Sequence, residues 1–225
     1  MNPFSFSQPE DAQAAIAQVA DNPSFAGDAV RFIAGGTNLL DLMKEGVMAS
    51  RRLVDINRLP LDKIEEDQEG GLRLGATARN ADTAYHALVR ERYPLLSAAI
   101  LAGASPQLRN MASNGGNLLQ RTRCYYFYDL ATPCNKREPN TGCAAIGGIT
   151  RQHAILGASE QCIATHPSDM CVALAALEAT VHVESVRGKR AIPFAEFHRL
   201  PGDAPQYDNC LLYTSPSPRD VEESR

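Results

Sequence analysis

The chain of 225 residues is long enough for one large domain or two small ones. Its hydrophobic fraction of 44% and charged fraction of 21% are typical of a soluble globular protein, and a formal net charge of −4 without a basic stripe argues against a nucleic-acid-binding protein. The sequence has no apolar run of about eighteen residues that would predict a membrane span, and its first residues lack both the basic and the apolar segment of a secretory signal.

The first part of the chain alternates between helical and strand patterns. Ser7 followed by the acidic pair Glu10 and Asp11 is typical of a helix start, with Ser7 as the cap. We expect, in order, a helix, a strand, a helix and a strand over residues 12–20, 29–34, 39–46 and 52–56. These elements predict a first lobe of residues 1–57, with a boundary near residues 58–60.

The second lobe is expected over residues 58–209, incomplete at its C-terminal end, and mixes strands with helices around a cysteine-containing loop over about 118–152. Alternation around a Gly-Gly pair predicts a hairpin over 63–75, and Asn80 is the expected cap of the helix that follows. Further expected helices cover residues 80–89, 93–102, 167–179 and 194–200, and expected strands cover 153–157, 180–186 and 190–192. The stretch from 109 to about 152 is polar and shows no period, and a loop this long is rare in a compact domain unless it is functional.

The last residues, 210–225, have no apolar face of either the helical or the strand period. They look like translated sequencing-adapter read-through rather than native protein. We therefore expect the native part of the sequence to be cut off near Asn209, and we expect no element of the fold in the tail.

A glycine turn joins the expected strand 29–34 to the helix that follows. Gly35 and Gly36 allow backbone angles that a Cβ atom would forbid, and either Thr37 or Asn38 is placed to cap the helix. Unpaired N–H groups and the helix dipole suit a phosphate or pyrophosphate at such a turn. The spacing matches neither a Walker loop nor the dinucleotide fingerprint, so an ordinary strand-turn-helix joint remains the alternative.

Two later stretches have similar chemistry. Residues 110–117 contain a second Gly-Gly turn between small polar side chains, and residues 165–169 precede the most apolar expected helix, which Ser168 or Asp169 is placed to cap. Taken singly, each stretch is explained by turn and cap chemistry as readily as by contacts to a phosphate or a ring. His153 and His166 are candidate metal or acid–base residues, although a lone histidine is more often structural.

Four cysteines lie in or beside the long polar stretch, at Cys124, Cys134, Cys143 and Cys162. Their spacing lacks the close pairs of structural zinc sites and of ferredoxin-type clusters. Basic residues nearby, which could offset the charge of thiolates, are Arg121, Arg123, Lys136 and Arg137. Spacing alone leaves open an iron–sulfur cluster, a zinc ion, disulfides or four unrelated thiols, whereas Cys171 fits a buried helix face as a small hydrophobic residue.

Together, residues 33–40, 107–118 and 165–169 resemble the FAD-binding (medium) subunit of the xanthine dehydrogenase family of molybdenum hydroxylases. The resemblance covers residues 3 to about 209. Within the family, residues 121–124, 133–137 and 142–145 resemble the FAD subunit of bacterial aldehyde oxidoreductases, including the periplasmic type, which carries an extra [4Fe–4S] cluster in this loop.

The resemblance implies an α+β fold, a PCMH-type FAD-binding domain of two lobes with the flavin between them. It implies that the pyrophosphate is held by Ala34, Gly35, Gly36, Thr37, Asn38 and Leu39. The remaining implied FAD contacts are Ala104, Ser113, Gly116, Asn117, Ser168 and Asp169. The implied ligands of the [4Fe–4S] cluster are Cys124, Cys134, Cys143 and Cys162.

The activity implied is electron relay within a larger complex. A partner subunit with the molybdenum cofactor would oxidise an aldehyde, a second partner with [2Fe–2S] centres would pass electrons on, and FAD in this subunit would deliver them to an acceptor. No side chain here need act as a catalytic acid or base. Because the family pattern extends beyond residue 209, we expect this chain to bind FAD weakly and to be poorly stable.

Other readings and the location of the protein follow from the same features. One alternative is a fragment of a single-chain FAD-dependent alcohol or sugar oxidase, and another is a non-catalytic assembly module in which the cysteines bind zinc.

Some relatives reach the periplasm together with a partner that bears the export signal. We expect this route if the resemblance holds and a cytoplasmic protein otherwise.

Overall fold

The computed structural model of the chain describes residues 2–20, 29–68 and 70–198. The tail 210–225, the expected truncation point at Asn209 and the end of the helix expected over 194–200 lie outside the described residues. No helix in the described ranges is long and apolar enough to cross a membrane. The expected domain bounds 1–57 and 58–209 stay a prediction.

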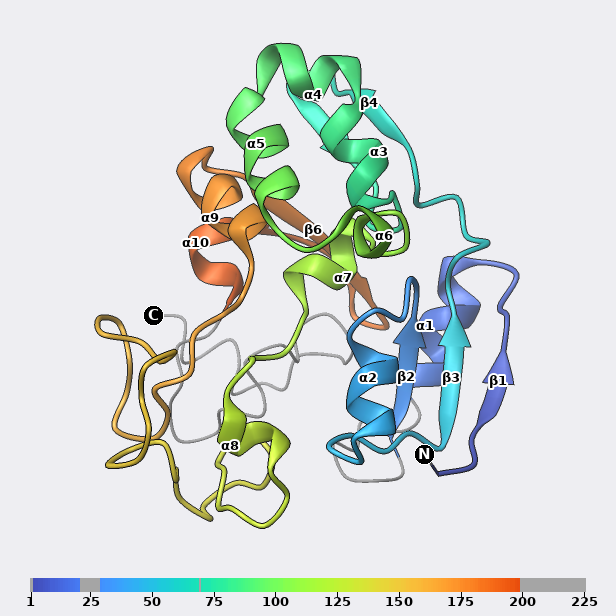
Figure 1. Cartoon of the computed structure of the whole chain (residues 1–225). Helices are drawn as coiled ribbons and strands as arrows, with labels where there is room; N and C mark the ends of the chain where they lie inside the picture. The colour runs from blue at the N-terminus through green and yellow to red at the C-terminus, as the bar shows by residue number, and fades with distance from the viewer. Residues whose placement is uncertain (1, 21–28, 69, 199–225) are drawn as a thin grey trace.

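The N-terminal part is built on a three-stranded parallel sheet of order β1-β3-β2. The strands are β1 (Ser5–Ser7), β2 (Val30–Ile33) and β3 (Arg52–Asp55), and the helices are α1 (Ala12–Ala20) and α2 (Leu39–Lys44). Arg52 of β3 pairs with Ser5 on one side and Val30 on the other. Helix α1 packs on β2 and β3, burying Ala15 and Val19 against Val30 and Val54, so apolar contact holds this sheet together (Figure 1).

Strand β1 corrects one prediction about the helix start. Ser7 ends β1 instead of capping α1, and the side-chain oxygen Oδ1 of Asp11 accepts the N–H of Ala14 at 2.7 Å. The acidic residue therefore does the capping, because it stands three positions before a free helical N–H. The other predicted helices and strands of this part are confirmed to within a few residues.

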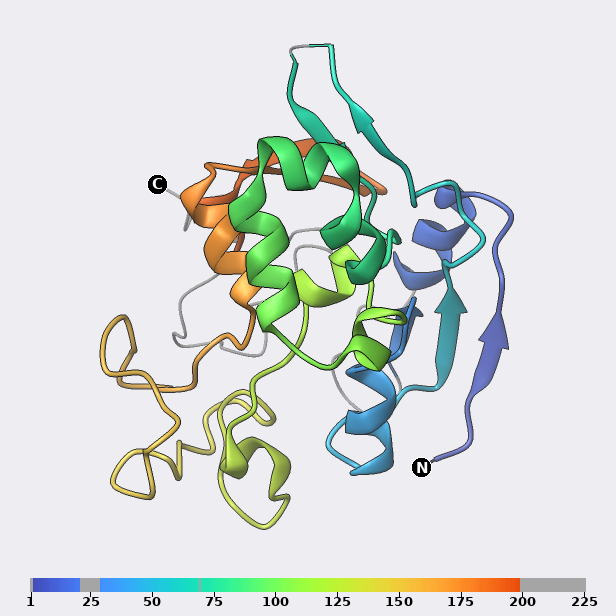
Figure 2. The same cartoon turned by 45° about the horizontal axis from the view of Figure 1, so that its top comes forward.

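The rest of the chain packs helices against two antiparallel hairpins. The hairpins are β4 (Ile64–Glu66) with β5 (Leu72–Leu74), and β6 (Thr180–Ser185) with β7 (Gly188–Pro193). The helices are α3 (Asn80–Tyr85), α4 (Ala87–Arg92), α5 (Pro94–Ala102), α6 (Pro106–Arg109), α7 (Asn114–Leu118), α8 (Tyr125–Tyr128), α9 (Asp169–Ala176) and α10 (Phe194–Phe197). Helix α5 packs on α3 and α9, and their buried faces form the largest apolar core (Figure 2).

Three predictions about this part are wrong. The single helix expected over 80–89 is two helices, because His86 has extended backbone angles (φ −60°, ψ 133°), and Asn80 lies inside α3 after the N-cap Arg79. The strand expected over 153–157 is absent among the described residues, where the chain makes turns and Ile155 is 96% exposed. An apolar run does not form a strand without a neighbouring strand or a core to cover it.

The polar stretch expected as a loop over 109 to about 152 contains two short helices, α7 and α8, and is otherwise mostly turns. We call residues 118–164 the cysteine loop. It extends below α7 and α9 in Figure 1, to one side of the helical body. The loop has its own small core, in which Leu42 of α2 packs with Phe127, Cys124, Cys134 and Ala145. The cysteine loop is therefore anchored on the N-terminal part of the chain.

Candidate functional site

The glycine turn between β2 and α2 lies directly against the second glycine turn. A Cβ atom on Gly35 would stand 1.9 Å from the carbonyl oxygen of Met111, and Gly36 has a positive φ of 73°. Only glycine permits both the close approach and the left-handed backbone. Residues 34–39 are all partly exposed, so the turn is accessible to a ligand.

The side chain of Asn38 corrects a second prediction. Asn38 stands at the N-cap position of α2 but its side chain makes no capping hydrogen bond, and neither residue predicted as the cap, Thr37 or Asn38, caps the helix by a side-chain bond. Instead, the side-chain oxygen Oδ1 of Asn38 accepts a hydrogen bond from the backbone N–H of Arg121 at 2.8 Å. A residue that looked like a local cap therefore ties the glycine turn to the start of the cysteine loop.

Further hydrogen bonds join the glycine turn to the second part of the chain. The Asn57 amide donates to the carbonyl of Ala34 at 3.0 Å. Arg79 donates to the carbonyl of Met111 at 2.6 Å and to Oδ1 of Asn57 at 3.0 Å. Arg79 thus bridges the two glycine turns, which sequence reasoning missed because neither Asn57 nor Arg79 lies in a recognisable motif.

The second and third polar stretches meet directly. Ser113 caps α7 by accepting the N–H of Gly116 at 3.2 Å, and Ser168 caps α9 by accepting the N–H of Cys171 at 3.0 Å. The Ser168 hydroxyl also donates to Oδ1 of Asn117 at 2.6 Å. The cap expected at Ser168 or Asp169 is therefore Ser168, and the two motifs form one hydrogen-bonded unit.

Two buried amides, Asn80 and Asn114, hold this unit in place, and the sequence did not predict their contact. Asn80 accepts from the amide of Asn117 at 2.8 Å and donates to Oδ1 of Asn114 at 3.1 Å. Asn114 also exchanges hydrogen bonds with Thr83. Such a network is costly to leave partly unpaired, so it fixes the α3–α7 contact on which the polar site rests.

The turn after α5 brings Ala104 and Asp169 to the same region. Ala104 has a positive φ of 53°, and a Cβ atom on Gly103 would stand 3.3 Å from Oδ2 of Asp169. The guanidinium of buried Arg109 donates to three carbonyls of this turn, Leu101 at 3.3 Å, Gly103 at 2.7 Å and Ala104 at 3.0 Å. Arg109 therefore holds the unusual backbone of Ala104 in place.

Replacing Arg109 with methionine is expected to lower the free energy of unfolding by about 2 kcal/mol, because three carbonyls lose a charged donor while the volume of the side chain is largely kept. Urea denaturation followed by circular dichroism measures the change. The exposed Arg73→Met variant on β5 is the control and should change stability by less than about 0.5 kcal/mol. Equal unfolding midpoints for the two variants would show that Arg109 does not hold the turn.

The four cysteines predicted as cluster ligands line one pocket in the cysteine loop, which we call the cysteine pocket. Cys124, Cys134 and Cys162 are buried and Cys143 is partly exposed, and none of the four is in a disulfide. Cys134 and Cys143 lie opposite each other in an antiparallel bridge. The rest of the pocket wall consists of Thr122, Tyr126, Phe127, Pro133, Asn135, Lys136, Ala145 and Ala164. The four cysteines, up to 38 positions apart in sequence, thus converge on one pocket, which their spacing alone did not predict.

Burial disfavours charge on the groups of this pocket. It raises the pKa of the Cys124 and Cys162 thiols, and the other thiols of the pocket add to this shift. Buried Lys136 has its pKa lowered to about 8, chiefly by burial. Metal ligation requires thiolates, so an ion bound here would release protons from the thiols to solvent.

His153 stands beside this pocket. Its Nε2 lies 3.1 Å from Sγ of Cys124, and its buried Nδ1 has no hydrogen-bond partner among the described residues. His166, the other histidine noted in the sequence, contacts Cys171 at 3.5 Å. The expectation that each is a structural residue stays a prediction.

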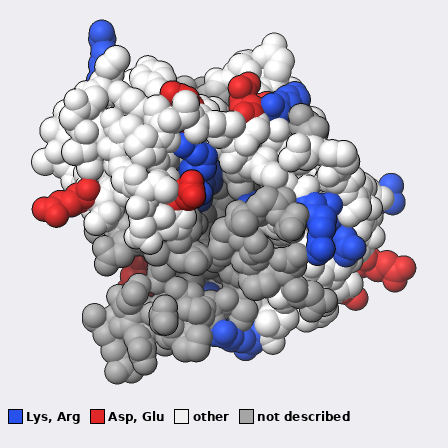
Figure 3. All heavy atoms as spheres, turned by 90° about the horizontal axis from the view of Figure 1, so that it is seen from below, with Lys and Arg blue, Asp and Glu red and all other residues white. Residues whose placement is uncertain are grey.

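Charged side chains of one sign do not gather into a large patch on the face seen in Figure 3. Lysine and arginine side chains lie there singly or in small groups between uncharged residues, with acidic side chains among them. On the described part of that face, this distribution agrees with the absence of a basic stripe in the sequence.

Known proteins share both the sequence and the fold. The family model described as the FAD-binding domain in molybdopterin dehydrogenase matches residues 2–213. The aldehyde oxidoreductase FAD-binding subunit PaoB of Escherichia coli (strain K12) is 57% identical over 183 residues, which are 81% of this chain and 58% of that protein. The carbon monoxide dehydrogenase medium chain of Hydrogenophaga pseudoflava is 30% identical over 115 residues, 51% of this chain and 39% of that one.

Solved structures agree on the fold. Quinoline 2-oxidoreductase from Pseudomonas putida 86 superposes with a TM-score of 0.61 at 24% identity, over 88% of this chain and 53% of that chain. The chain spans 58% or less of the length of the relatives named here. These likenesses confirm the α+β, PCMH-type fold of the FAD-binding medium subunits. The chain belongs to the family of FAD-binding domains of molybdopterin dehydrogenases.

Proposed function

We propose that the chain is the flavin-binding part of a molybdenum-dependent oxidoreductase that acts on an aldehyde or, as in xanthine dehydrogenases, on a heterocycle. The observation that carries the proposal is the convergence of three polar turns, around Gly35, Ser113 and Ser168, in one hydrogen-bonded region. The likeness to an aldehyde oxidoreductase FAD-binding subunit favours the aldehyde.

The residues of the three turns fit FAD. Ala34 to Leu39 would hold the pyrophosphate, because two glycines keep side chains away and the turn opens α2, where N–H groups and the helix dipole favour an anion. The remaining contacts to phosphate, sugar or ring edge would come from Ala104, Ser113, Gly116, Asn117, Ser168 and Asp169. When bound, FAD supplies the electron-transfer chemistry, and the chain supplies binding and orientation.

The cysteine pocket fits a [4Fe–4S] cluster. Cys124, Cys134, Cys143 and Cys162 would be its ligands, since iron–sulfur clusters are held by four thiolates and these four side chains line one pocket. Lys136 in the same wall would offset the negative charge of the ligated cluster. A zinc ion suits four thiolates equally well on chemistry alone, and it is the competing occupant that the experiment must separate.

The partners follow from this assignment. A subunit with the molybdenum cofactor would oxidise the substrate, and a subunit with [2Fe–2S] centres would pass electrons toward this chain. No described side chain is needed as a catalytic acid or base, because the chain's part is to position redox groups.

The experiment is to purify the chain anaerobically and to titrate it with FAD, following the quenching of flavin fluorescence. We expect saturable binding of FAD and at least tenfold weaker binding of FMN, which lacks the pyrophosphate bridge to adenosine. An iron–sulfur absorption shoulder after reconstitution supports the cluster. A colourless, zinc-loaded chain that takes up neither flavin nor iron would refute the proposal and favour the assembly module.

A further inference from the structure

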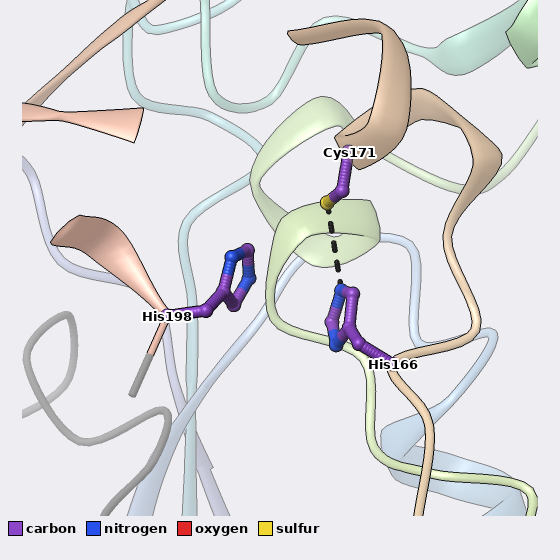
Figure 4. A group of neighbouring side chains, drawn as sticks. All are labelled: His166, Cys171 and His198. Atoms are coloured by element: carbon purple, nitrogen blue, oxygen red, sulfur yellow. Dashed lines mark hydrogen bonds between the residues drawn. The ribbon is translucent and has the colours of Figure 1, made fainter. Parts of the chain in front are cut away.

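A group of metal-ligating side chains lies outside both sites described above. The ligand atoms of His166, Cys171 and His198 all lie within 4.8 Å of one another (Figure 4). His166 precedes α9, Cys171 lies in its first turn, and His198 follows α10. Segments at the ends of two short helices thus bring three possible ligands together. The sequence singled out His166 alone, because 27 positions separate Cys171 from His198 and no spacing links them.

The orientation of the two imidazoles suits a metal. His198 places Nε2 2.7 Å from the carbonyl of Leu118, and since a carbonyl only accepts, Nε2 carries the proton and Nδ1 keeps its lone pair. A backbone carbonyl bonded to the far ring nitrogen is the usual second partner of a metal-binding histidine. His166 directs Nε2 toward Sγ of Cys171 at 3.5 Å.

Packing leaves the group fixed on one side and open on the other. The His198 ring packs edge-on against Phe197 at 4.8 Å and Phe194 at 5.5 Å, and it lies 4.4 Å from the His166 ring. Cys171 is buried, whereas the His166 side is exposed and gives an entry path. The 3.5 Å between Nε2 of His166 and Sγ of Cys171 matches the ligand spacing around a tetrahedral ion with metal–ligand bonds of about 2.0–2.3 Å. All three ligand atoms lie within 4.8 Å of one another, so a bound ion would draw the third ligand inward.

We propose that His166, Cys171 and His198 bind one zinc ion, with water in the fourth position. Two imidazoles and one thiolate are a ligand set that zinc accepts, and zinc prefers the tetrahedral arrangement that three protein ligands and one water provide. The site is distinct from the cysteine pocket, with which it shares no residue. The proposal stands apart from flavin binding, since it uses none of the residues assigned to FAD.

The test uses Co²⁺ as a spectroscopic probe on the flavin-free full chain, after iron–sulfur reconstitution has filled the cysteine pocket. Difference spectra should show one equivalent of cobalt with a thiolate charge-transfer band. We expect Cys171→Ala to lose the band, and His166→Ala and His198→Ala to bind at least tenfold more weakly. The control His182→Ala changes an exposed imidazole on β6 and should leave the titration unchanged. Equal titrations for Cys171→Ala and the unchanged chain would overturn the proposal.

A second measurement needs no variant to fold. X-ray absorption on the zinc-loaded unchanged chain, with its cluster in place, should give one sulfur neighbour at about 2.3 Å and three nitrogen or oxygen neighbours at about 2.0 Å, from two imidazoles and one water. A shell of four sulfurs would place the zinc in the cysteine pocket, and a shell of oxygens alone would show surface binding. Either result would refute a site at His166, Cys171 and His198.

Discussion

Replacing Gly35 with alanine is expected to weaken FAD binding by more than about tenfold and to lower the free energy of unfolding by about 3 kcal/mol. The new Cβ would stand 1.9 Å from the carbonyl oxygen of Met111, which is backbone and has no rotamer into which it can move. Overpacking of this kind costs about 1–3 kcal/mol or more, because the two glycine turns must separate. Fluorescence titration with FAD and thermal melting measure the two effects.

The control for this variant is Gly157→Ala. Gly157 has a positive φ of 69°, but an added Cβ would meet no atom within 4 Å, so alanine there brings backbone strain without a collision. We expect a loss of about 1 kcal/mol and unchanged FAD affinity. If Gly35→Ala bound FAD as tightly as Gly157→Ala, the contact between the two turns would not form part of the flavin site.

The second large effect is expected at the cysteine pocket. Replacing Cys134 with alanine should reduce iron retained after reconstitution to background, because a cluster with three of its four thiolates in a partly open pocket is easily lost. Iron analysis and the visible absorption of the cluster measure the change. The expected loss is complete rather than partial, since the ligand is removed outright.

The matched control is Cys171→Ala, which removes another buried thiol of the chain from outside the pocket. It should retain iron like the unchanged chain while losing the separate zinc or cobalt proposed above. If Cys134→Ala and Cys171→Ala retained equal iron, the cysteine pocket would not hold a cluster. If Cys134→Ala instead lost one equivalent of zinc and no iron, the assembly module would be the better reading.

Local chemistry made part of the fold predictable. Periodicity predicted α1, α5 and both hairpins because each has a regular apolar face or a glycine turn that decides it locally. It failed at His86, where one extended residue breaks a helical pattern, and at Ile155, where an apolar run has nothing to pack on. Both failures depend on tertiary context, which a local pattern does not contain.

In the candidate site, too, residues with a local role were predictable from the sequence and residues with a tertiary role were not. The glycines and the serine caps were visible because a turn demands those residues locally. The contacts made by Arg79, Asn80 and Arg109 were not visible. Arg79 belongs to no motif, Asn80 was expected only as a helix cap, and the stretch 107–118 does not reveal that Arg109 turns back onto the carbonyls of the preceding turn. Asn38 was misread for a related reason: its side chain had a plausible local role, and a contact with Arg121 took precedence.

Helix α2 links the two parts of the site through a single short element. At one end it continues from the glycine turn, and along its side Leu42, fully buried, packs with Phe127 and two of the pocket cysteines. An occupant of the pocket would hold the partners of Leu42 in place and so order the turn at the start of α2. Occupation of the cysteine pocket and binding of flavin at the glycine turn should therefore be cooperative, with each occupied site raising the affinity of the other by the same factor.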